Sequence, residues 1–140
     1  MSETMNLHRA PEIMTLDRAV WAGRIMSALV VAALAADGAI QLLAPAHIAS
    51  MLHETGFAME TTIVVGPIVL ACAILYATPA TSVLGAILVT GFLGGAICAH
   101  VRIGELGSPP ELVSLLLGVM TWGGLYLRDP RIQAILPLSR

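Results

Sequence analysis

Four long apolar stretches constrain the fold of this chain more than any other feature of its sequence. They cover residues 19–43, 61–77, 81–101 and 112–127. An α-helix needs about 20 apolar residues to cross a bilayer, with a range of ~17–25. The second and fourth stretches lie at the short limit, so their ends are expected to recruit interfacial residues. We therefore predict four membrane-spanning helices.

The composition agrees with a domain embedded in lipid. Of the 140 residues, 57% are hydrophobic and 11% are charged, and the mean hydropathy is +0.86. A typical soluble domain is about half apolar and about a quarter charged, so this excess is too large for one small water-soluble core. The length predicts a single transmembrane domain over residues 1–140. The expected fold class is all-α, an integral membrane four-helix bundle.

Local signals at the joints favour helix starts where the apolar stretches begin. Thr15 resembles an N-cap with an acidic residue in the first turn. Thr78 and Pro79 predict a tight reversal, with Pro79 in the first turn of the third helix. Ser108 and Glu111 have the spacing of a capping box, in which each side chain satisfies a free backbone amide.

The connection between the first two stretches contains a candidate interfacial helix over residues 45–54. Its apolar residues fall on one side, namely Ile48, Met51 and Leu52. Its polar residues fall largely on the other side, namely His47, Ser50, His53 and Glu54. Gly56 is suited to end such a helix. An amphipathic element of this kind lies in the plane of the interface; the alternative is an ordinary loop with chance amphipathicity.

The distribution of arginine predicts the orientation in the membrane. With four spans, both termini share one side, and that side carries Arg9, Arg18, Arg24, Arg128, Arg131 and Arg140. The opposite side carries only Arg102. Because positive charge is retained on the cytoplasmic side, we expect a multi-pass protein of the cell inner (cytoplasmic) membrane with both termini cytoplasmic. The aromatic residues are expected to form an interfacial belt on that side, namely Trp21, Tyr76, Trp122 and Tyr126.

The third stretch carries small residues at helical spacing. At about 100° per residue, one face holds Gly91, Gly94, Gly95, Cys98 and Arg102. Small residues at this spacing let helix backbones approach closely in lipid. We predict that Gly91, Gly94 and Gly95 serve helix packing within the bundle. The alternative is a contact with another chain, either in a homo-oligomer or with a membrane protein partner.

Polar residues at the non-cytoplasmic end form a candidate ligand-binding site. Ionisable residues inside spans are costly and point to function. Asp37 lies in the first stretch with Gln41 one turn later, and His100 reaches a similar depth in the third stretch. With two residues that follow His100, the predicted set is Asp37, Gln41, His100, Arg102 and Glu105. The alternative is a solvated rim in which Asp37 is hydrogen-bonded inside the bundle.

The direction of His100 is left open by the sequence, because its face lies roughly opposite the glycines. If the glycines face the bundle, His100 faces lipid or a partner; if His100 faces inward, the glycines face outward. His100 is the one histidine inside a predicted span, so haem held by two histidines is not expected. No metal site is predicted, no cofactor is evident, and a quinone is possible in chemical terms. The net charge of −2 leaves no basic surface for nucleic acid.

Three sequence runs resemble the DoxX-like family of small four-helix membrane proteins. They are TGFLGGA at 90–96, AHVR at 99–102 and WGGLYLRDPR at 122–131, and LLAP at 42–45 also fits. The resemblance covers most of the chain, from Arg24 to Leu138. One departure lies in residues 37–41, where the family pattern leads us to expect a glycine and often a lysine after the first span. Gly38 and Gln41 stand nearby, and no lysine is present.

The resemblance implies a four-helix bundle. Relatives in the wider group are linked to sulfur or thiol redox chemistry and to quinone reduction, while others act in the trafficking or assembly of membrane proteins. No catalytic motif accompanies the resemblance, so we do not expect the chain to act as an enzyme on its own. The first functional hypothesis is an accessory or scaffold subunit. The second is a protein that binds a quinone or another lipophilic small molecule. The third is a small proton-coupled transporter that uses Asp37.

Overall fold

The computed structural model describes the backbone of residues 3–135 and the side chains of residues 17–134. Every regular element in this part of the chain is a helix, as predicted. In chain order they are α1 (Glu3–Leu43), the short 3-10 helix η1 (Pro45–Ile48), α2 (Ala49–Thr55), α3 (Thr61–Ala77), α4 (Ser82–Arg102), α5 (Pro109–Arg128) and α6 (Pro130–Ile135).

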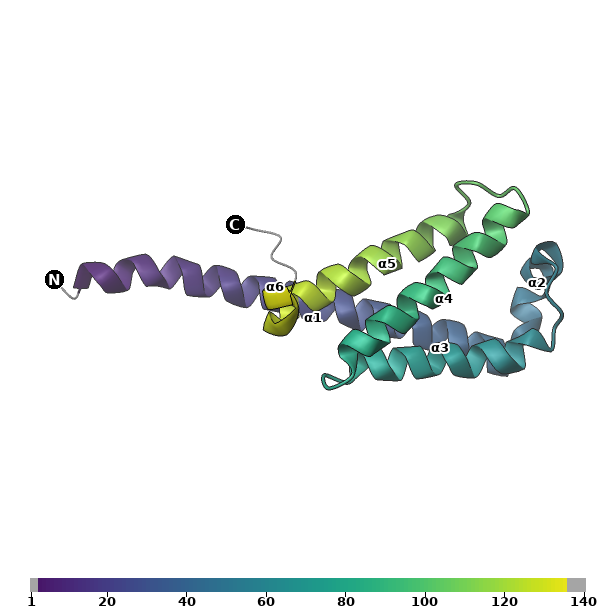
Figure 1. The fold of residues 1–140 in the computed structure, drawn as a ribbon, viewed down its shortest axis with the longest axis horizontal. Helices are drawn as coiled ribbons and strands as arrows, with labels where there is room; N and C mark the ends of the chain where they lie inside the picture. Colours follow the sequence, from purple (N-terminus) through teal and green to yellow (C-terminus); the bar gives the residue numbers. More distant parts are fainter. Residues whose placement is uncertain (1–2, 136–140) are drawn as a thin grey trace.

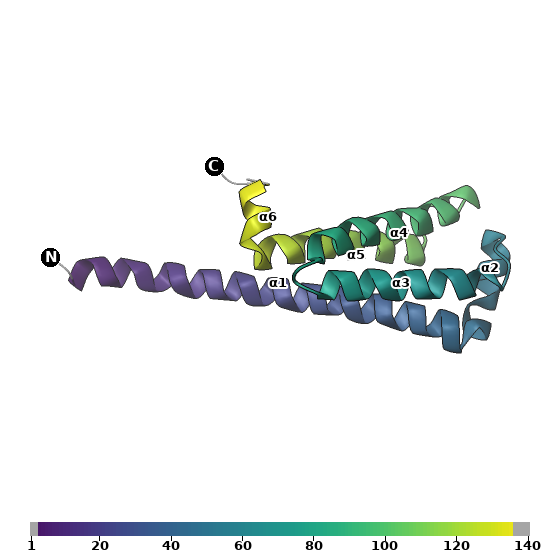
Figure 2. The same ribbon diagram turned by 60° about the horizontal axis from the view of Figure 1, so that its bottom comes forward.

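Helices α1, α3, α4 and α5 form the four-helix bundle (Figures 1 and 2). Helix α1 packs on α3 and α5, and α4 packs on the same two helices, so α1 and α4 lie across the diagonal. The pair α4–α5 diverges from the pair α1–α3 toward the end that carries α2 (Figure 1). We call this the loop end. The opposite end, where α3 and α5 finish, is called the arginine end after Arg24 and Arg128.

The bundle is that of a multi-pass membrane protein. Three segments are long and apolar enough to cross a bilayer: residues 17–43 of α1 (27 residues), α4 (21 residues) and α5 (20 residues). The fourth helix, α3, is shorter at 17 residues but just as apolar. Its outward side chains Ile63, Val64 and Ile74 are more than 60% exposed. Such a surface is suited to lipid rather than to water.

Helices α3, α4 and α5 begin within three residues of the predicted stretches, whereas α1 begins well before its stretch, and the predicted side-chain caps are not formed. Helix α1 is continuous from Glu3, so the predicted N-cap at Thr15 is wrong. The preceding residues are mostly helix formers, which outweigh a local cap signal. Pro79 lies in the turn before α4 rather than in its first turn. Ser108 is the N-cap of α5, but it makes no side-chain cap, and Glu111 accepts a 2.7 Å hydrogen bond from the Gly107 amide.

The predicted short helix between the first two spans is confirmed, in two pieces. Its first turn is η1 and its remainder is α2, which ends at Gly56 as expected. Gly56 has a φ of 74°, a conformation that side chains other than glycine rarely adopt. The amide of Phe57 then donates a 2.8 Å hydrogen bond back to the Leu52 carbonyl. That α2 lies in the plane of the membrane stays a prediction.

Close helix contacts depend on glycines of three different interfaces. A Cβ at Gly23 of α1 would lie 2.8 Å from the Gly124 carbonyl oxygen of α5. A Cβ at Gly38 of α1 would lie 3.1 Å from the Gly66 carbonyl oxygen of α3. A Cβ at Gly85 of α4 would lie only 2.2 Å from the Tyr76 backbone nitrogen. Small residues let these backbones approach, which is how helices gain contact in lipid.

Candidate functional site

Asp37 and Gln41 face each other on the loop-end half of α1. Gln41 Nε2 donates a 2.9 Å hydrogen bond to Asp37 Oδ2, as side chains four residues apart on a helix can do. Gln41 is buried and Asp37 is half-buried. The carboxyl group is therefore held on its own helix by an amide, which corresponds to the alternative of a hydrogen-bonded Asp37.

A small pocket adjoins Gln41 between the end of α1 and the start of α3. Its volume is about 310 Å³, and it is lined by Gln41, Leu42, Pro45, Met59, Glu60, Thr62 and Ile63. The walls are mostly apolar, and the Gln41 amide, the Glu60 carboxyl group and the Thr62 hydroxyl lie on them. A few polar groups among apolar walls are typical of a small-molecule site.

His100 faces inward at the loop end of α4. It is 6% exposed, and its Nδ1 lies 2.7 Å from Oε2 of Glu105. Glu105 follows α4, and its backbone amide donates to the His100 carbonyl at 3.1 Å. The two residues form the one ion pair among the described side chains, if the imidazole is protonated. The question that the sequence left open is answered, because His100 belongs to the interior.

Arg102 connects α4 to α2. One of its guanidinium nitrogens donates a hydrogen bond to the carbonyl oxygen of Thr55, the last residue of α2. This carbonyl is one of those that a helix leaves without a partner at its C-terminal end. Arg102 therefore caps α2 and fixes it beside the end of α4.

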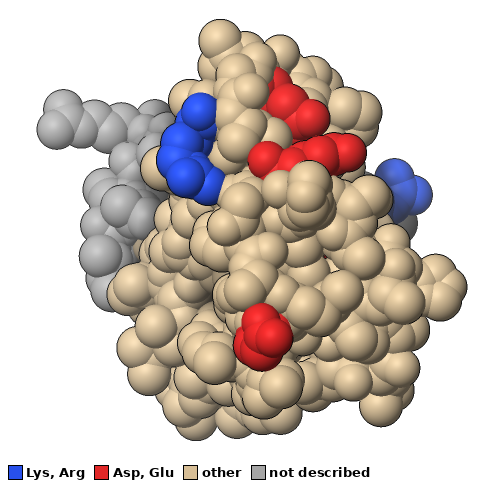
Figure 3. All heavy atoms as spheres, turned by 90° about the vertical axis from the view of Figure 1, so that its right-hand side faces the viewer, with Lys and Arg blue, Asp and Glu red and all other residues tan. Residues whose placement is uncertain are grey.

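The structure divides the predicted five-residue site into separate groups. Of the five residues, only Gln41 lines the pocket beside it. Asp37 and His100 lie on α1 and α4, which are diagonal in the bundle, and no hydrogen bond or ion pair in residues 17–134 joins them. Figure 3, which looks onto the loop end, shows acidic side chains near the top and again lower down, with uncharged surface between them. Each predicted polar residue is thus satisfied locally.

The glycines at 91, 94 and 95 do not pack inside this chain, which corrects the prediction. A Cβ at Gly91, Gly94 or Gly95 would meet nothing within 4 Å, and all three residues are exposed. Since His100 occupies the inner side of α4, the glycines on the opposite side face outward. They leave a notch in the outer surface of α4, and the alternative of a contact with another chain stays a prediction.

Tyr76 is a polar residue whose role the sequence did not reveal. It was expected in the interfacial belt, but it is 0% exposed in the core. Its hydroxyl donates to the Thr121 carbonyl at 2.8 Å and lies 3.0 Å from Ser27 Oγ. The signal was present in the pattern Val69, Cys72, Ala73 and Tyr76, all buried, which is one continuous stripe of α3.

In the part of the chain that the structure describes, no group of three or more His, Cys, Asp or Glu side chains is placed to hold a metal ion. Cys72 is buried in the core, whereas Cys98 is exposed. The loop-end groups can accept or donate hydrogen bonds and accommodate a small apolar molecule, but they do not form an acid–base pair on one cavity.

The chain matches a protein-family model. The model of the DoxX-like family matches residues 25–124, which is more than half of the 140 residues. The matched part runs from α1 to α5 and contains both the inward His100 and the outward glycines. Comparison with curated proteins and with solved structures gives no match.

Proposed function

Since the chain belongs to the DoxX-like family, we propose that it is an accessory or scaffold subunit of a redox system in the cytoplasmic membrane. It packs against a larger membrane protein through the outer surface of α4. Both termini lie in the cytoplasm. The redox setting comes from the family resemblance, and the packing role comes from the geometry of α4.

The open glycine notch of α4 carries this proposal. Gly91, Gly94 and Gly95 lie side by side on the outer surface, and a Cβ added at any of them would have no neighbour within 4 Å. Helices in lipid associate through van der Waals contact, and glycines at this spacing allow another helix backbone to approach. The apolar side chains of Leu84 and Ile87 continue the same surface toward the arginine end and are 50% and 54% exposed. The surface is therefore shaped for one transmembrane helix.

A different protein fits this surface better than a second copy does. Two copies inserted with the same orientation pair around a two-fold axis, so each residue near the axis meets itself. Arg102 and Cys98 lie on the glycine side of α4 and are exposed. In a symmetric pair the two Arg102 residues, each bonded to the Thr55 carbonyl of its own chain, would lie on the same side of the contact, and like charges near each other are unfavourable at the edge of the bilayer. A partner that offers an acidic or polar group at this depth avoids that cost.

The cytoplasmic orientation rests on charge. The arginine end carries Arg24, Arg128 and Arg131, and the loop end carries Arg102 alone among the described residues. Loops rich in arginine are retained in the cytoplasm. A cysteine-accessibility or reporter-fusion experiment at the C-terminus tests this side directly, and a periplasmic C-terminus would overturn it.

The partner is tested by solubilising membranes of the native host in a mild detergent and isolating the tagged full chain. We expect a defined complex, larger than the chain itself, that contains a reproducible set of membrane redox proteins. A Gly94→Leu substitution fills the notch, so the complex should fall by about tenfold, the loss that corresponds to ~1.4 kcal/mol of packing.

The matched control is Ala71→Leu. Ala71 is also a small exposed residue, but it lies on the outer surface of α3, so this substitution adds the same bulk away from α4 and should leave the complex intact. Isolation of the chain as a monomer, or as a homodimer that Gly94→Leu dissociates, would overturn the proposal.

The pocket beside Gln41 favours a second candidate function, the binding of a quinone or a similar lipophilic ring. Its volume of about 310 Å³ and its mostly apolar walls suit a small ring, and the Gln41 amide and the Thr62 hydroxyl lie on its lining. However, Thr62 Oγ1 donates to the Met59 carbonyl, and Gln41 donates to Asp37. The carbonyl oxygen and second N–H of the Gln41 amide, together with the Glu60 carboxyl group, therefore remain uncommitted among the hydrogen bonds described.

Quinone binding is tested by titrating a short-chain ubiquinone analogue into the purified chain and following thermal stability. Gln41→Leu removes the amide while keeping an apolar wall, so binding should weaken. Leu106→Gln, in the exposed α4–α5 connection, serves as the control and should leave binding unchanged. If the parent chain gains no stability from the analogue, this second function is excluded.

A further inference from the structure

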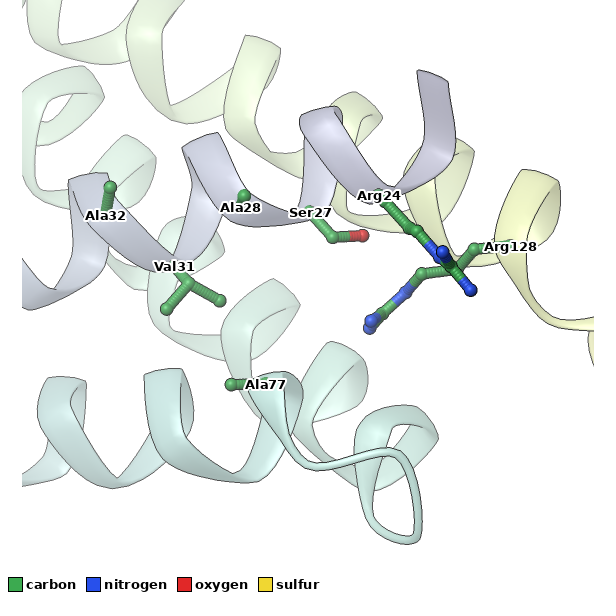
Figure 4. Close-up of a pocket in the computed structure, with 7 residues that line it drawn as sticks. All are labelled: Arg24, Ser27, Ala28, Val31, Ala32, Ala77 and Arg128. Carbon is green, nitrogen blue, oxygen red and sulfur yellow. The ribbon is translucent and has the colours of Figure 1, made fainter. Parts of the chain in front are cut away.

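The arginine end carries a second, larger hollow that the proposed function does not use. It is a groove of about 400 Å³ between α1, the end of α3 and the end of α5. Figure 4 shows Arg24 from α1 and Arg128 from α5 pointing into the same space beside Ser27. Small apolar residues continue the groove along α1 and α3, namely Ala28, Val31, Ala32 and Ala77.

No acidic side chain in the described lining of the groove neutralises either arginine. Among the described side chains, no carboxylate lies within 4.0 Å of either guanidinium, and the one ion pair is at the loop end. The lining consists of two arginines, one serine and apolar residues. Two positive charges that share one groove repel each other, so a bound anion would stabilise the arrangement.

The structure holds both guanidinium groups in place without using all of their donors. Arg128 lies over the Tyr76 ring at 5.1 Å and donates one hydrogen bond of 3.1 Å to the Tyr76 carbonyl. Its Nε is buried and has no partner. Arg24 lies over the Trp21 ring at 5.6 Å. Stacking on aromatic rings orients a guanidinium and leaves its N–H groups free, and these groups match the oxygens of a phosphate.

The depth of the groove matches the headgroup region of a bilayer. The spanning part of α1 begins at Asp17, α3 ends at Ala77 and α5 ends at Arg128. Trp21, beside Arg24, is 61% exposed, as expected for an aromatic residue at the membrane surface. From the arginines, exposed Ala28 and Ala32 lie one turn apart on α1 and lead toward the apolar interior. The groove is therefore polar at headgroup depth and apolar below it.

We propose that this groove binds an anionic phospholipid, with its phosphate between Arg24 and Arg128 and one acyl chain along Ala28 and Ala32. Basic pockets between transmembrane helices on the cytoplasmic side are suited to anionic headgroups. A zwitterionic lipid is less suited, because the described lining has no carboxylate to receive its amine. The alanines in place of larger residues leave space for the chain. This site is independent of the α4 surface and of the Gln41 pocket.

The test uses the purified full chain in detergent and measures the binding of phosphatidylglycerol and phosphatidylcholine with matched acyl chains by native mass spectrometry. Phosphatidylglycerol should be preferred. Arg24→Gln should weaken its binding about fivefold, which corresponds to ~1 kcal/mol for one arginine near an anionic surface. Arg24 is exposed and stacks on Trp21, so this variant should fold. Arg102→Gln, at the loop end, is the matched control and should leave the binding unchanged.

A second arm separates a lipid from free phosphate. Ala32→Leu narrows the apolar part of the groove without changing its charge, so it should weaken phosphatidylglycerol binding, while Ala71→Leu on the outer surface of α3 should not. Inorganic phosphate at millimolar concentration should not displace the lipid. The proposal is overturned if both lipids bind equally, if Arg24→Gln and Arg102→Gln behave alike, or if phosphate displaces the lipid and Ala32→Leu has no effect.

Discussion

At the arginine end a single buried side chain joins three helices, whereas at the loop end each polar contact lies within one helix or joins at most two segments. Tyr76 of α3 reaches Ser27 of α1 and the Thr121 carbonyl of α5. At the loop end, Gln41 contacts Asp37 on its own helix, His100 contacts Glu105, and Arg102 contacts α2. None of these loop-end contacts crosses the bundle.

This difference between the two ends shows which contacts hold the four helices together. Glycine lets α1 approach α5 at Gly23 and Gly124, and lets α4 approach the end of α3 at Gly85. Polar bonds inside that contact region are shielded from water, so they act together with the packing. Toward the loop end α4 and α5 diverge from α1 and α3 (Figure 1), although α1 and α3 stay in close contact at Gly38 and Gly66. Short segments are held at the helix ends there. We therefore expect substitutions at the arginine end to change global stability, and substitutions at the loop end to change local order.

The largest expected effect is at Gly85. Gly85→Ala places a Cβ 2.2 Å from the Tyr76 backbone nitrogen, so α3 and α4 must move apart. We expect the free energy of unfolding to fall by about 3 kcal/mol, the upper range for overpacking. Gly94→Ala on the same helix is the matched control, because nothing lies within 4 Å of its Cβ. It should be neutral or stabilising by up to ~1 kcal/mol.

Both variants are measured by denaturant unfolding in detergent micelles, followed by circular dichroism. Equal losses in the free energy of unfolding at Gly85 and Gly94 would show that an added methyl group destabilises α4 at either position. The contrast between a closed inner surface and an open outer surface of α4 would then be wrong.

The next effect is at Tyr76. Tyr76→Phe keeps the ring and removes the hydroxyl, which leaves Ser27 Oγ in the core without that partner. We expect a loss of about 1 kcal/mol, within the range for buried hydrogen bonds in water and in membranes. Tyr126→Phe is the control, since Tyr126 is half-buried and its hydroxyl makes no hydrogen bond among the described residues. Thermal unfolding of the two variants side by side gives the comparison, which fails if Tyr126→Phe costs as much.

At the loop end, Glu105→Ala should have a smaller and more local effect. It removes the partner of His100 Nδ1, and because Glu105 is partly exposed, water can replace the lost bond. We expect a loss of less than about 1 kcal/mol in global stability. Amide hydrogen exchange should become faster in the last turn of α4 and in the following turn only. Glu54→Ala, an exposed residue of α2, should leave exchange there unchanged; faster exchange along all of α4 would contradict the local reading.

Most of the fold could be predicted from the sequence, because a bilayer demands long apolar helices and hydropathy reveals them. The four apolar helices, the short helix between α1 and α3 and its end at Gly56 were all predicted. The choice of packing glycines was not. The notch at Gly91, Gly94 and Gly95 has the strongest pattern, yet the close contacts are at Gly23, Gly38 and Gly85. Each of these three is an isolated glycine in the sequence, and only the arrangement of four helices shows which one meets a backbone.

The candidate site was predicted less well, for a related reason. Depth in the membrane can be counted along a helix, so Asp37 and His100 were correctly placed toward the same end. The sequence does not tell which helices are neighbours in the bundle. In the structure α1 and α4 are diagonal, so Asp37 and His100 do not meet. Tyr76 was predicted to lie at the membrane interface because it is close to the end of α3, and its depth along the helix was the only criterion used. Its burial depends on Gly85, which brings the start of α4 against it.

The smallest expected effect is at Arg102. Arg102→Gln removes the charged donor to the Thr55 carbonyl, and because the arginine is exposed, the loss in global stability should stay below about 0.5 kcal/mol. Exchange of the α2 amides should nevertheless become several-fold faster, since α2 has few other contacts with the bundle. Arg131→Gln, an exposed arginine of α6, should not change it. If α2 exchange is unaffected by Arg102→Gln, the loop end is held by packing, and the two ends differ less than their polar contacts indicate.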